Sequence, residues 1–419
     1  MDPLLSALRR LASAVSKDLV GPLPDSGSFK PPPTSDLYVS FRAGWNWYIL
    51  DHHPLKARVQ ELLSNDGEIS QLFTQGSETW LSCPLGDVRI HAETLLHGLF
   101  EAAAFEILAL AWPGGATALP DRVEDGLRRL RSIAAGRPVR VHSIAGFGGI
   151  TVPARTDITL PWGALRTTQG HVGPTALASS RPATVGISTE TALTFEVRHE
   201  PPGKRRQLQR EQIWVAKTRF PLSVLLSSTL SGRVPYFAWR LHLLPCTWWP
   251  SVEAGSATSL AQKSPAQLTG RQVRQIATAA SLVEERYAGS LNIAVERILA
   301  AMADRTDDSD RLIDALIAWE SLVGTGQEVT YRVTSALATL LTRRVDDRLA
   351  LQRKLRSVYG LRSRLVHGDP VAASSLRSGS ELALEVATGA LKALMIRRPD
   401  LIPMTSERRA DSLILGRRR

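Results

Sequence analysis

An arginine and a histidine stand five residues apart in the segment 359–368, which reads YGLRSRLVHG. The guanidinium of Arg362 could hold two phosphoryl oxygens through parallel hydrogen bonds. The imidazole of His367 has an ordinary pKa of about 6.5, so it could accept or donate a proton near neutral pH. Ser363 precedes His367 by four residues and could hydrogen-bond to that imidazole if the segment is helical. These three side chains are therefore the candidate catalytic residues for a reaction at a phosphodiester.

The segment that carries these residues has the spacing of one amphipathic helix ending near Gly368 and Pro370. Its apolar face contains Leu351, Leu355, Val358 and Leu365. Arg362 stands on the same face, where an unpaired buried charge is strongly destabilising, so we expect it to have a partner. Arg362 and His367 diverge by about 140° on a regular helix. The two side chains could still converge if Arg362 extends along the groove and the last turn loosens at Gly368.

A second out-of-place residue is Glu320, in the segment 311–323, which reads RLIDALIAWESLV. The helical spacing of Leu312, Leu316 and Val323 indicates an apolar stripe, and Glu320 lies on or beside it. Glu320 and Arg362 therefore suggest each other as partners. The alternative is that Glu320 only borders the stripe and reaches solvent.

The same region is strongly basic, with eight cations and two acids between Leu341 and His367. Such a surface would contact a nucleic-acid backbone with little sequence information. The predicted RNA-binding residues are Arg353, Lys354, Arg356 and Arg364. The alternative is a solvated helical face stabilised by ion pairs along the helix.

Taken together, the helix of Glu320 and the segment 359–368 resemble the HEPN superfamily of ribonucleases, and most closely its ApeA-like branch in prokaryotic defence proteins. The resemblance is carried by Arg362 and His367 at a helix end, by Tyr359 three positions before the arginine, and by the upstream glutamate. It covers roughly a third of the chain.

The resemblance implies metal-independent RNA cleavage without a cofactor. The 2′-hydroxyl would attack phosphorus and leave a 2′,3′-cyclic phosphate, with His367 carrying protons and Arg362 stabilising the phosphoryl charge. Glu320 and Tyr359 would support the site. The family also implies a homodimer through the helical bundle, in which two arginine–histidine pairs share one groove.

For the whole chain we predict an α+β protein, with a mixed α/β region containing an antiparallel sheet before a C-terminal all-α HEPN-like bundle. An amphipathic helix is expected over 4–19, helices over 55–63, 88–111 and 122–134, and strands between 138 and 250. Four or five helices are expected from 267 to 397. The expected divisions are a helix and Pro-rich linker at 1–34, a sensor or regulatory region at 35–250, a linker at 251–266, the bundle at 267–398 and a loose basic tail at 399–419.

Composition agrees with a folded protein that has an anionic partner. The 419 residues include 51 Lys and Arg against 40 Asp and Glu, a net charge of +11. Two cysteines are too few for a disulfide framework or a Cys-rich zinc site, and no signal or membrane-spanning segment is evident, so we expect a cytoplasmic protein. Phosphate-binding-loop, serine-hydrolase and zinc-protease motifs are absent from the sequence.

Three functions remain open from the sequence. The first is an endoribonuclease that acts as a toxin or an antiviral defence effector. The second is an inactive HEPN-like binding or dimerisation module, suggested because Ser363 stands where active members often have Asn or Asp. The third is a nucleic-acid-binding regulator that uses the basic tail and the loop 204–210.

Overall fold

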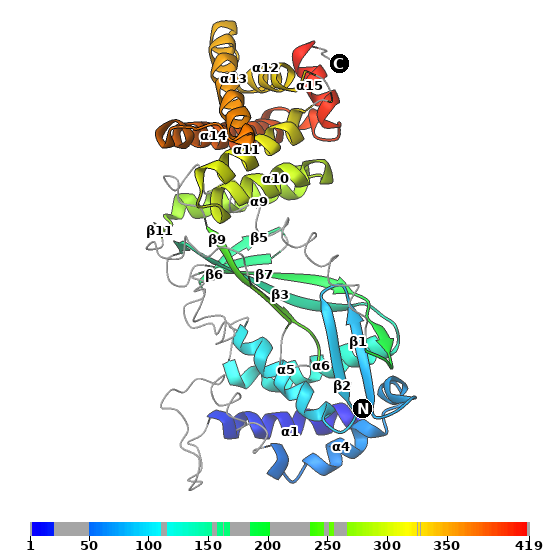
Figure 1. Ribbon diagram of the computed structural model, residues 1–419. Helices are drawn as coiled ribbons and strands as arrows, with labels where there is room; N and C mark the ends of the chain where they lie inside the picture. The colour runs from blue at the N-terminus through cyan, green and yellow to red at the C-terminus, as the bar shows by residue number, and fades with distance from the viewer. Residues whose placement is uncertain are drawn as a thin grey trace. The chain divides into compact units, whose positions relative to one another are not determined.

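The computed structural model describes residues 2–20, 50–109, 115–152, 157–161, 163–167, 185–201, 235–246, 251–254, 266–324, 326 and 328–416 (Figure 1). The chain forms two compact units. One contains described residues from Met1–Gly146, Trp162–Glu211 and Ala238–Gly255, and the other contains described residues from Phe147–Pro161, Gln212–Phe237 and Ser256–Arg419. Antiparallel sheets in the N-terminal part and helices over residues 270–414 confirm the predicted α+β class.

Most helices of the first unit pack through one apolar face, whereas α5 (Leu95–Ala109) is buried on most sides. The other helices are α1 (Pro3–Val20), α4 (Lys56–Ser64) and α6 (Leu119–Ala134), with 3-10 helices η1 (Ile69–Phe73) and η2 (Gly115–Ala118). The expected N-terminal helix is present as α1, whose Leu8, Leu11 and Val15 are buried and which packs on α6 and α4. The helix expected over 122–134 is present as α6, which has a proline in its first turn.

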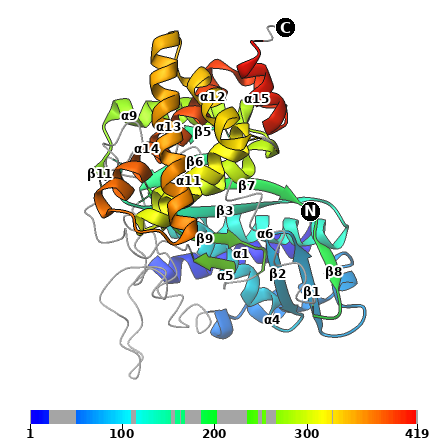
Figure 2. The same ribbon diagram turned by 45° about the horizontal axis from the view of Figure 1, so that its top comes forward.

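The first unit also contains two antiparallel arrangements of strands (Figure 2). Strands β1 (Glu78–Cys83), β2 (Gly86–His91) and β8 (Glu196–Arg198) form one sheet in the order β2-β1-β8. Strands β3 (Val139–Gly148), β6 (Gly163–Thr167), β7 (Val185–Leu193), β9 (Tyr236–Leu243) and β10 (Ser251–Ala254) are neighbours in the order β10-β9-β3-β7-β6. Two expectations are corrected, since residues 88–91 belong to β2 rather than a helix and residues 251–254 form β10 rather than a linker.

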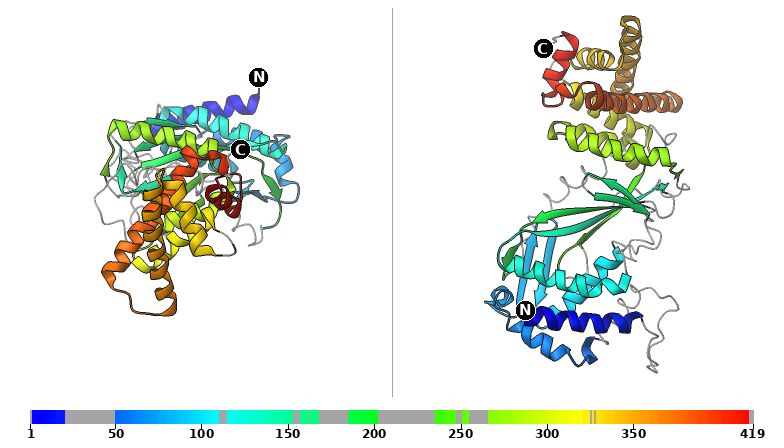
Figure 3. Two further views of the ribbon diagram at one scale, coloured as in Figure 1. Left: turned by 90° about the horizontal axis from the view of Figure 1, so that it is seen from above. Right: turned by 180° about the vertical axis from the view of Figure 1, so that it is seen from behind.

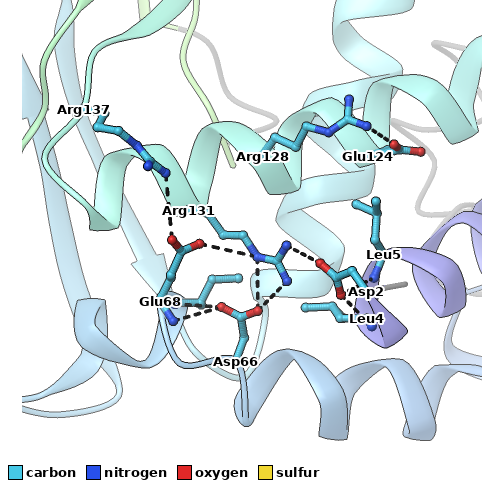
Figure 4. A network of polar contacts seen from close by, with 10 residues as sticks. Asp2, Leu4, Leu5, Asp66, Glu68, Glu124, Arg128, Arg131 and Arg137 are labelled. Carbon is cyan, nitrogen blue, oxygen red and sulfur yellow. Dashed lines mark hydrogen bonds and ion pairs between the residues drawn. The ribbon is translucent and has the colours of Figure 1, made fainter.

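A network of ion pairs in the first unit centres on Arg131 of α6 (Figure 4). Its Nη2 donates to Asp66 Oδ2 at 2.6 Å, and its Nη1 donates to Asp2. Asp2 also accepts the backbone N–H groups of Leu4 and Leu5 at the start of α1. The hydrogen bond from Arg131 is the main reason that the pKa of Asp2 lies below its ordinary value. Arg131 thus joins the beginning of α1 to α6 and to the turn before η1.

The second unit is built around α11 (Figure 3). Its helices are α9 (Gly270–Arg286), α10 (Asn292–Leu299), α11 (Asp308–Val323), α12 (Val329–Leu341), α13 (Val345–His367), α14 (Ala373–Arg397) and α15 (Ser406–Ile414), with a π-helical turn η6 (Ala300–Asp304) and a 3-10 helix η7 (Pro399–Leu401). Short strands β4 (Ile150–Thr151) and β11 (Ala266–Gln267) pair in parallel, and β5 (Asp157–Leu160) contacts α9. Helix α11 contacts α10, α12, α13, α14 and α15 and is buried on most sides, with Trp319 fully enclosed.

Two expectations for the C-terminal part are wrong. Six α-helices, rather than four or five, lie between residues 267 and 397 in the part of the chain that the structure describes, and α15 follows them at Ser406–Ile414. The segment after Pro399 is not a loose tail, since Leu401, Ile402 and Leu413 are buried in the core of the bundle. The side chain of Thr405 accepts the backbone N–H of Arg408 and starts α15.

Several expected features lie outside the described residues. They are the Pro-rich segment 21–34, part of the strand region expected between 138 and 250, the basic loop 204–210 and residues 417–419 of the basic tail. No helix among the described residues has the length and apolar character needed to cross a membrane.

Candidate functional site

Helix α11 holds the candidate carboxylate, Glu320, in a fixed place. The side chain of Asp307 accepts backbone N–H groups at the start of the helix, from Ser309 at 2.8 Å and Asp310 at 3.2 Å. Near its end, the indole Nε1 of Trp319 donates to the backbone oxygen of Ala383 at 2.9 Å. These contacts fix both ends of α11 within the bundle, so the position of Glu320 is set by the core next to it.

A further carboxylate of α11, Asp314, is buried and was not predicted as a site residue. Its Oδ1 accepts from Arg297 Nη1 at 2.8 Å, and its Oδ2 accepts from Arg305 Nε at 2.7 Å. Asp314 therefore ties α11 to α10 and to the chain just before α11. The sequence signal that could have identified Asp314 is its position between Ile313 and Ala315, in an otherwise apolar run.

Helix α13 presents Arg362 on its packed face, as the sequence pattern predicts. Leu355, Val358 and Tyr359 on this face are buried, whereas Arg362 is half-exposed. The ring of Tyr359 lies 5.9 Å from that of Trp319, at an interplanar angle of 58°. Burial is the main cause that raises the pKa of the Tyr359 hydroxyl, so this group remains a proton donor at neutral pH.

Glu320, Tyr359 and Arg362 meet in one cluster, and the expected pairing of Glu320 with Arg362 is present. Arg362 Nη1 donates to Glu320 Oε1 at 3.2 Å, and the Tyr359 hydroxyl donates to the same oxygen at 3.4 Å. The side chains of Arg362 and Glu320 are 36% and 28% exposed, so the pair is open to solvent on one side. One oxygen of Glu320 accepts a hydrogen bond from one guanidinium nitrogen of Arg362. The other N–H donors of the guanidinium have no partner among the described residues, so they can bind a ligand.

The end of α13 does not loosen, so the condition for Arg362 and His367 to converge is not met. Gly368 has φ 77°, and the N–H groups of Gly368 and Asp369 donate to the backbone oxygens of Leu365 and Arg364. This pattern is a Schellman motif, which closes a regular helix. Because α13 is helical to His367, the directions of Arg362 and His367 differ by about 140° around its axis. The structure therefore does not bring these two side chains together within one chain.

Ser363 and His367 are both exposed to solvent near the end of α13. In the described part of the chain, no hydrogen bond joins them, so the contact expected from their spacing is not formed. His367 is thus accessible to a ligand from outside the bundle.

The basic residues predicted to bind RNA lie along the exposed surface of α13. Arg353, Lys354, Arg356 and Arg364 are exposed, and none of them has an ion-pair partner among the described residues. These cations form a solvated helical face, as the alternative also predicts, without ion pairs among the described residues. In the same described part, no group of three or more His, Cys, Asp or Glu side chains is arranged to hold a metal ion.

Comparisons with known proteins add no assignment. No family model, no curated protein and no solved structure matches this chain. The resemblance to the HEPN superfamily therefore depends on the residues of α11 and α13 alone.

Proposed function

We propose that the C-terminal bundle is a metal-independent endoribonuclease, and that the chain acts in the cytoplasm as an effector of a prokaryotic antiviral defence or toxin system. The observation that carries this proposal is the half-exposed Arg362, which is held by one oxygen of Glu320 and keeps further donors free. The exposed His367 on the same helix adds an imidazole, the side chain most often used as a general acid or base. Unpaired cations along α13 supply a surface for phosphates.

In this reaction the oxygen of an RNA 2′-hydroxyl attacks the adjacent phosphorus, and the bond from phosphorus to the 5′-oxygen breaks. One imidazole accepts the hydroxyl proton, and an imidazolium donates a proton to the leaving 5′-oxygen. Arg362 stabilises the charge that develops on the non-bridging oxygens. The products are a 2′,3′-cyclic phosphate and a 5′-hydroxyl, and Glu320 acts by positioning Arg362.

A homodimer is part of the proposal, because two imidazoles are needed and one chain supplies a single candidate. An exposed face of α13 contains Val345, Leu349, Arg356, Ser363 and His367. Their spacing of four, seven, seven and four residues keeps them within about 40° around the helix. Val345 and Leu349 are 64% and 48% exposed, and α13 extends past α12 and α15 (Figures 1 and 3). Pairing of two such faces would cover these apolar side chains and place two copies of His367 in one interface.

The central test is RNA cleavage by the purified protein and by His367→Ala, in the presence of EDTA. We expect the unchanged protein to give fragments with cyclic phosphate ends and the variant to give none. The control is His91→Ala, which removes an exposed histidine of β2 in the other unit. Equal cleavage by the parent and His367→Ala would overturn the assignment.

The dimer is tested by sedimentation of Leu349→Lys, which adds a charge to the exposed face of α13. We expect a shift toward monomer and a fall in cleavage, since the two imidazoles would then separate. The matched control is Ile293→Lys, at a residue of α10 that is 58% exposed. A parent protein that sediments as a monomer while it cleaves RNA would contradict the shared site.

A second candidate function is a binding or dimerisation module without turnover. The divergence of Arg362 and His367 within one chain and the solvent-exposed Ser363 favour it. It predicts RNA binding by the basic face of α13 without cyclic phosphate products, and a gel-shift assay beside the cleavage assay distinguishes the two.

A further inference from the structure

A hollow of about 540 Å³ lies on the polar side of α1 in the first unit. Its described lining includes Arg9, Arg10 and Lys17 of α1, and His53 from the chain before α4. Ser6 adds a hydroxyl group, whereas the Ser13 hydroxyl donates to the backbone oxygen of Arg9 at 2.8 Å. Among the described residues that line the hollow there is no acid, so its electrostatic potential favours an anion.

The sequence of α1 places these groups on one side of the helix. Ser6, Arg10, Ser13 and Lys17 follow a spacing of four, three and four residues, which keeps them on one face. The opposite face is buried through Leu8, Leu11 and Val15. Since the apolar face fixes the rotation of α1, the basic face is held toward the hollow.

The three cations of α1 differ in how far they are neutralised. Arg9 donates to Asp121 Oδ1 at 2.9 Å and to Glu124 Oε2 at 2.6 Å. Arg10 and Lys17 are exposed, and neither has an ion-pair partner in the part of the chain that the structure describes. Arg9 therefore serves the packing of α1 on α6, whereas Arg10 and Lys17 remain available to a ligand.

We propose that this hollow binds a small phosphorylated ligand of nucleotide size. Its volume falls within the range of about 300–1,000 Å³ that is typical of small-molecule sites. Arg10 and Lys17 stand about 10 Å apart along the helix axis. Their long side chains can reach toward each other, so a ligand with two or more phosphoryl groups would contact both. Serine hydroxyls and arginine are suited to phosphoryl oxygens. This site does not depend on the RNA-cleavage proposal, because all of its residues belong to the first unit.

Isothermal titration of the full-length protein with pyrophosphate and with ATP tests the site. We expect saturable binding, and a loss of about 10- to 100-fold in affinity in the double variant Arg10→Gln/Lys17→Gln, because two charge-assisted hydrogen bonds are removed. The matched control is Arg137→Gln/Arg140→Gln, which removes the same charge from side chains of the first unit that are 59% and 75% exposed. The control should bind as the parent does.

A second variant tests whether the ligand binds inside the hollow or is only attracted to the positive charge around it. Ala14 also lines the hollow, and Ala14→Trp would fill it without changing any charge. We expect this variant to lose ATP binding while circular dichroism and the unfolding midpoint show that it is folded.

No binding of either probe by the parent, or equal loss in both double variants, would overturn the proposal. Tighter binding of single-stranded RNA than of ATP, abolished by the same Arg10 and Lys17 changes, would also overturn it.

Discussion

Two arginines, Arg131 in the first unit and Arg362 in the second, both lie beside carboxylates but differ in how fully their donors are used. Arg131 donates to Asp2 and Asp66 and lies 3.8 Å from Glu68, and its side chain is 19% exposed (Figure 4). Arg362 is 36% exposed and donates to Glu320. The number of guanidinium N–H groups that donate to carboxylates therefore distinguishes an arginine that stabilises the fold from one that can bind a ligand.

The difference follows from where the carboxylates come from. Asp2 and Asp66 each accept backbone N–H groups at the start of a helical segment as well as Arg131, so they are part of the framework. Glu320 is in the last turn of α11 and extends from a helix whose other sides are packed. A carboxylate of this kind can orient one edge of a guanidinium and leave the rest for phosphate.

The largest expected effect is on activity, in Arg362→Met. If the proposed function is correct, RNA cleavage should fall by about 10²- to 10³-fold, because the group that stabilises the phosphoryl charge is lost. The free energy of unfolding should change by less than about 1 kcal/mol, since a half-exposed ion pair contributes little. Initial rates of cleavage and urea unfolding measure both. A stable variant that retains full cleavage would show that Arg362 is not catalytic.

The next largest effect is on stability, in Arg131→Met. We expect a loss of about 2–3 kcal/mol in the free energy of unfolding, because Asp2 and Asp66 would face each other without a cation. Hydrogen-exchange mass spectrometry should locate the loss of protection in α1 and in residues 66–73. RNA cleavage by the folded fraction should equal that of the parent. Stability equal to that of the parent would contradict the structural role given to this network.

A smaller effect concerns pH. The folded-state pKa of Asp2 lies below 3.8, chiefly because of Arg131. This group therefore stabilises the fold at pH values above its unfolded pKa, and the contribution is lost as pH falls through the lower, folded pKa. We expect the stability difference between the parent and Arg131→Met to be largest near neutral pH and to shrink below about pH 4. Urea unfolding midpoints over this range measure it. A difference that is constant across the range would show that Asp2 does not contribute.

The sequence predicted the Glu320–Arg362 pair because each residue interrupts an apolar stripe, and the spacing of those stripes is a local property. It could not predict how α13 ends. Gly368 and Pro370 indicate a stop, but both a loosened turn and a Schellman motif are compatible with them. The choice between these two ends matters, since the regular end separates Arg362 from His367.

Errors elsewhere have the same origin in contacts that are distant in sequence. Val88 and Ile90 alternate as a strand does, yet they precede an apolar helix directly, and only pairing with β1 shows where the strand ends. The segment after Pro399 is rich in charge, but Leu401 is buried where η7 contacts α14, and Leu413 is buried where α15 packs on α11 and α12. Basic composition alone therefore misjudged a packed element as a tail.

The smallest expected effect is in Tyr359→Phe, which tests whether Glu320 needs a second donor to orient Arg362. The variant keeps the ring that packs near Trp319 and removes the hydroxyl that donates to Glu320 at 3.4 Å. A bond of this length should contribute about 0.5–1 kcal/mol to stability. If Glu320 positions Arg362, cleavage should fall by less than about tenfold, well short of the loss in Arg362→Met. Leu355→Ala, which removes a buried side chain of the same helix and keeps the Tyr359 hydroxyl, is the control. A fall in cleavage as large in this control would show that the effect comes from α13 stability rather than from the Glu320 contact.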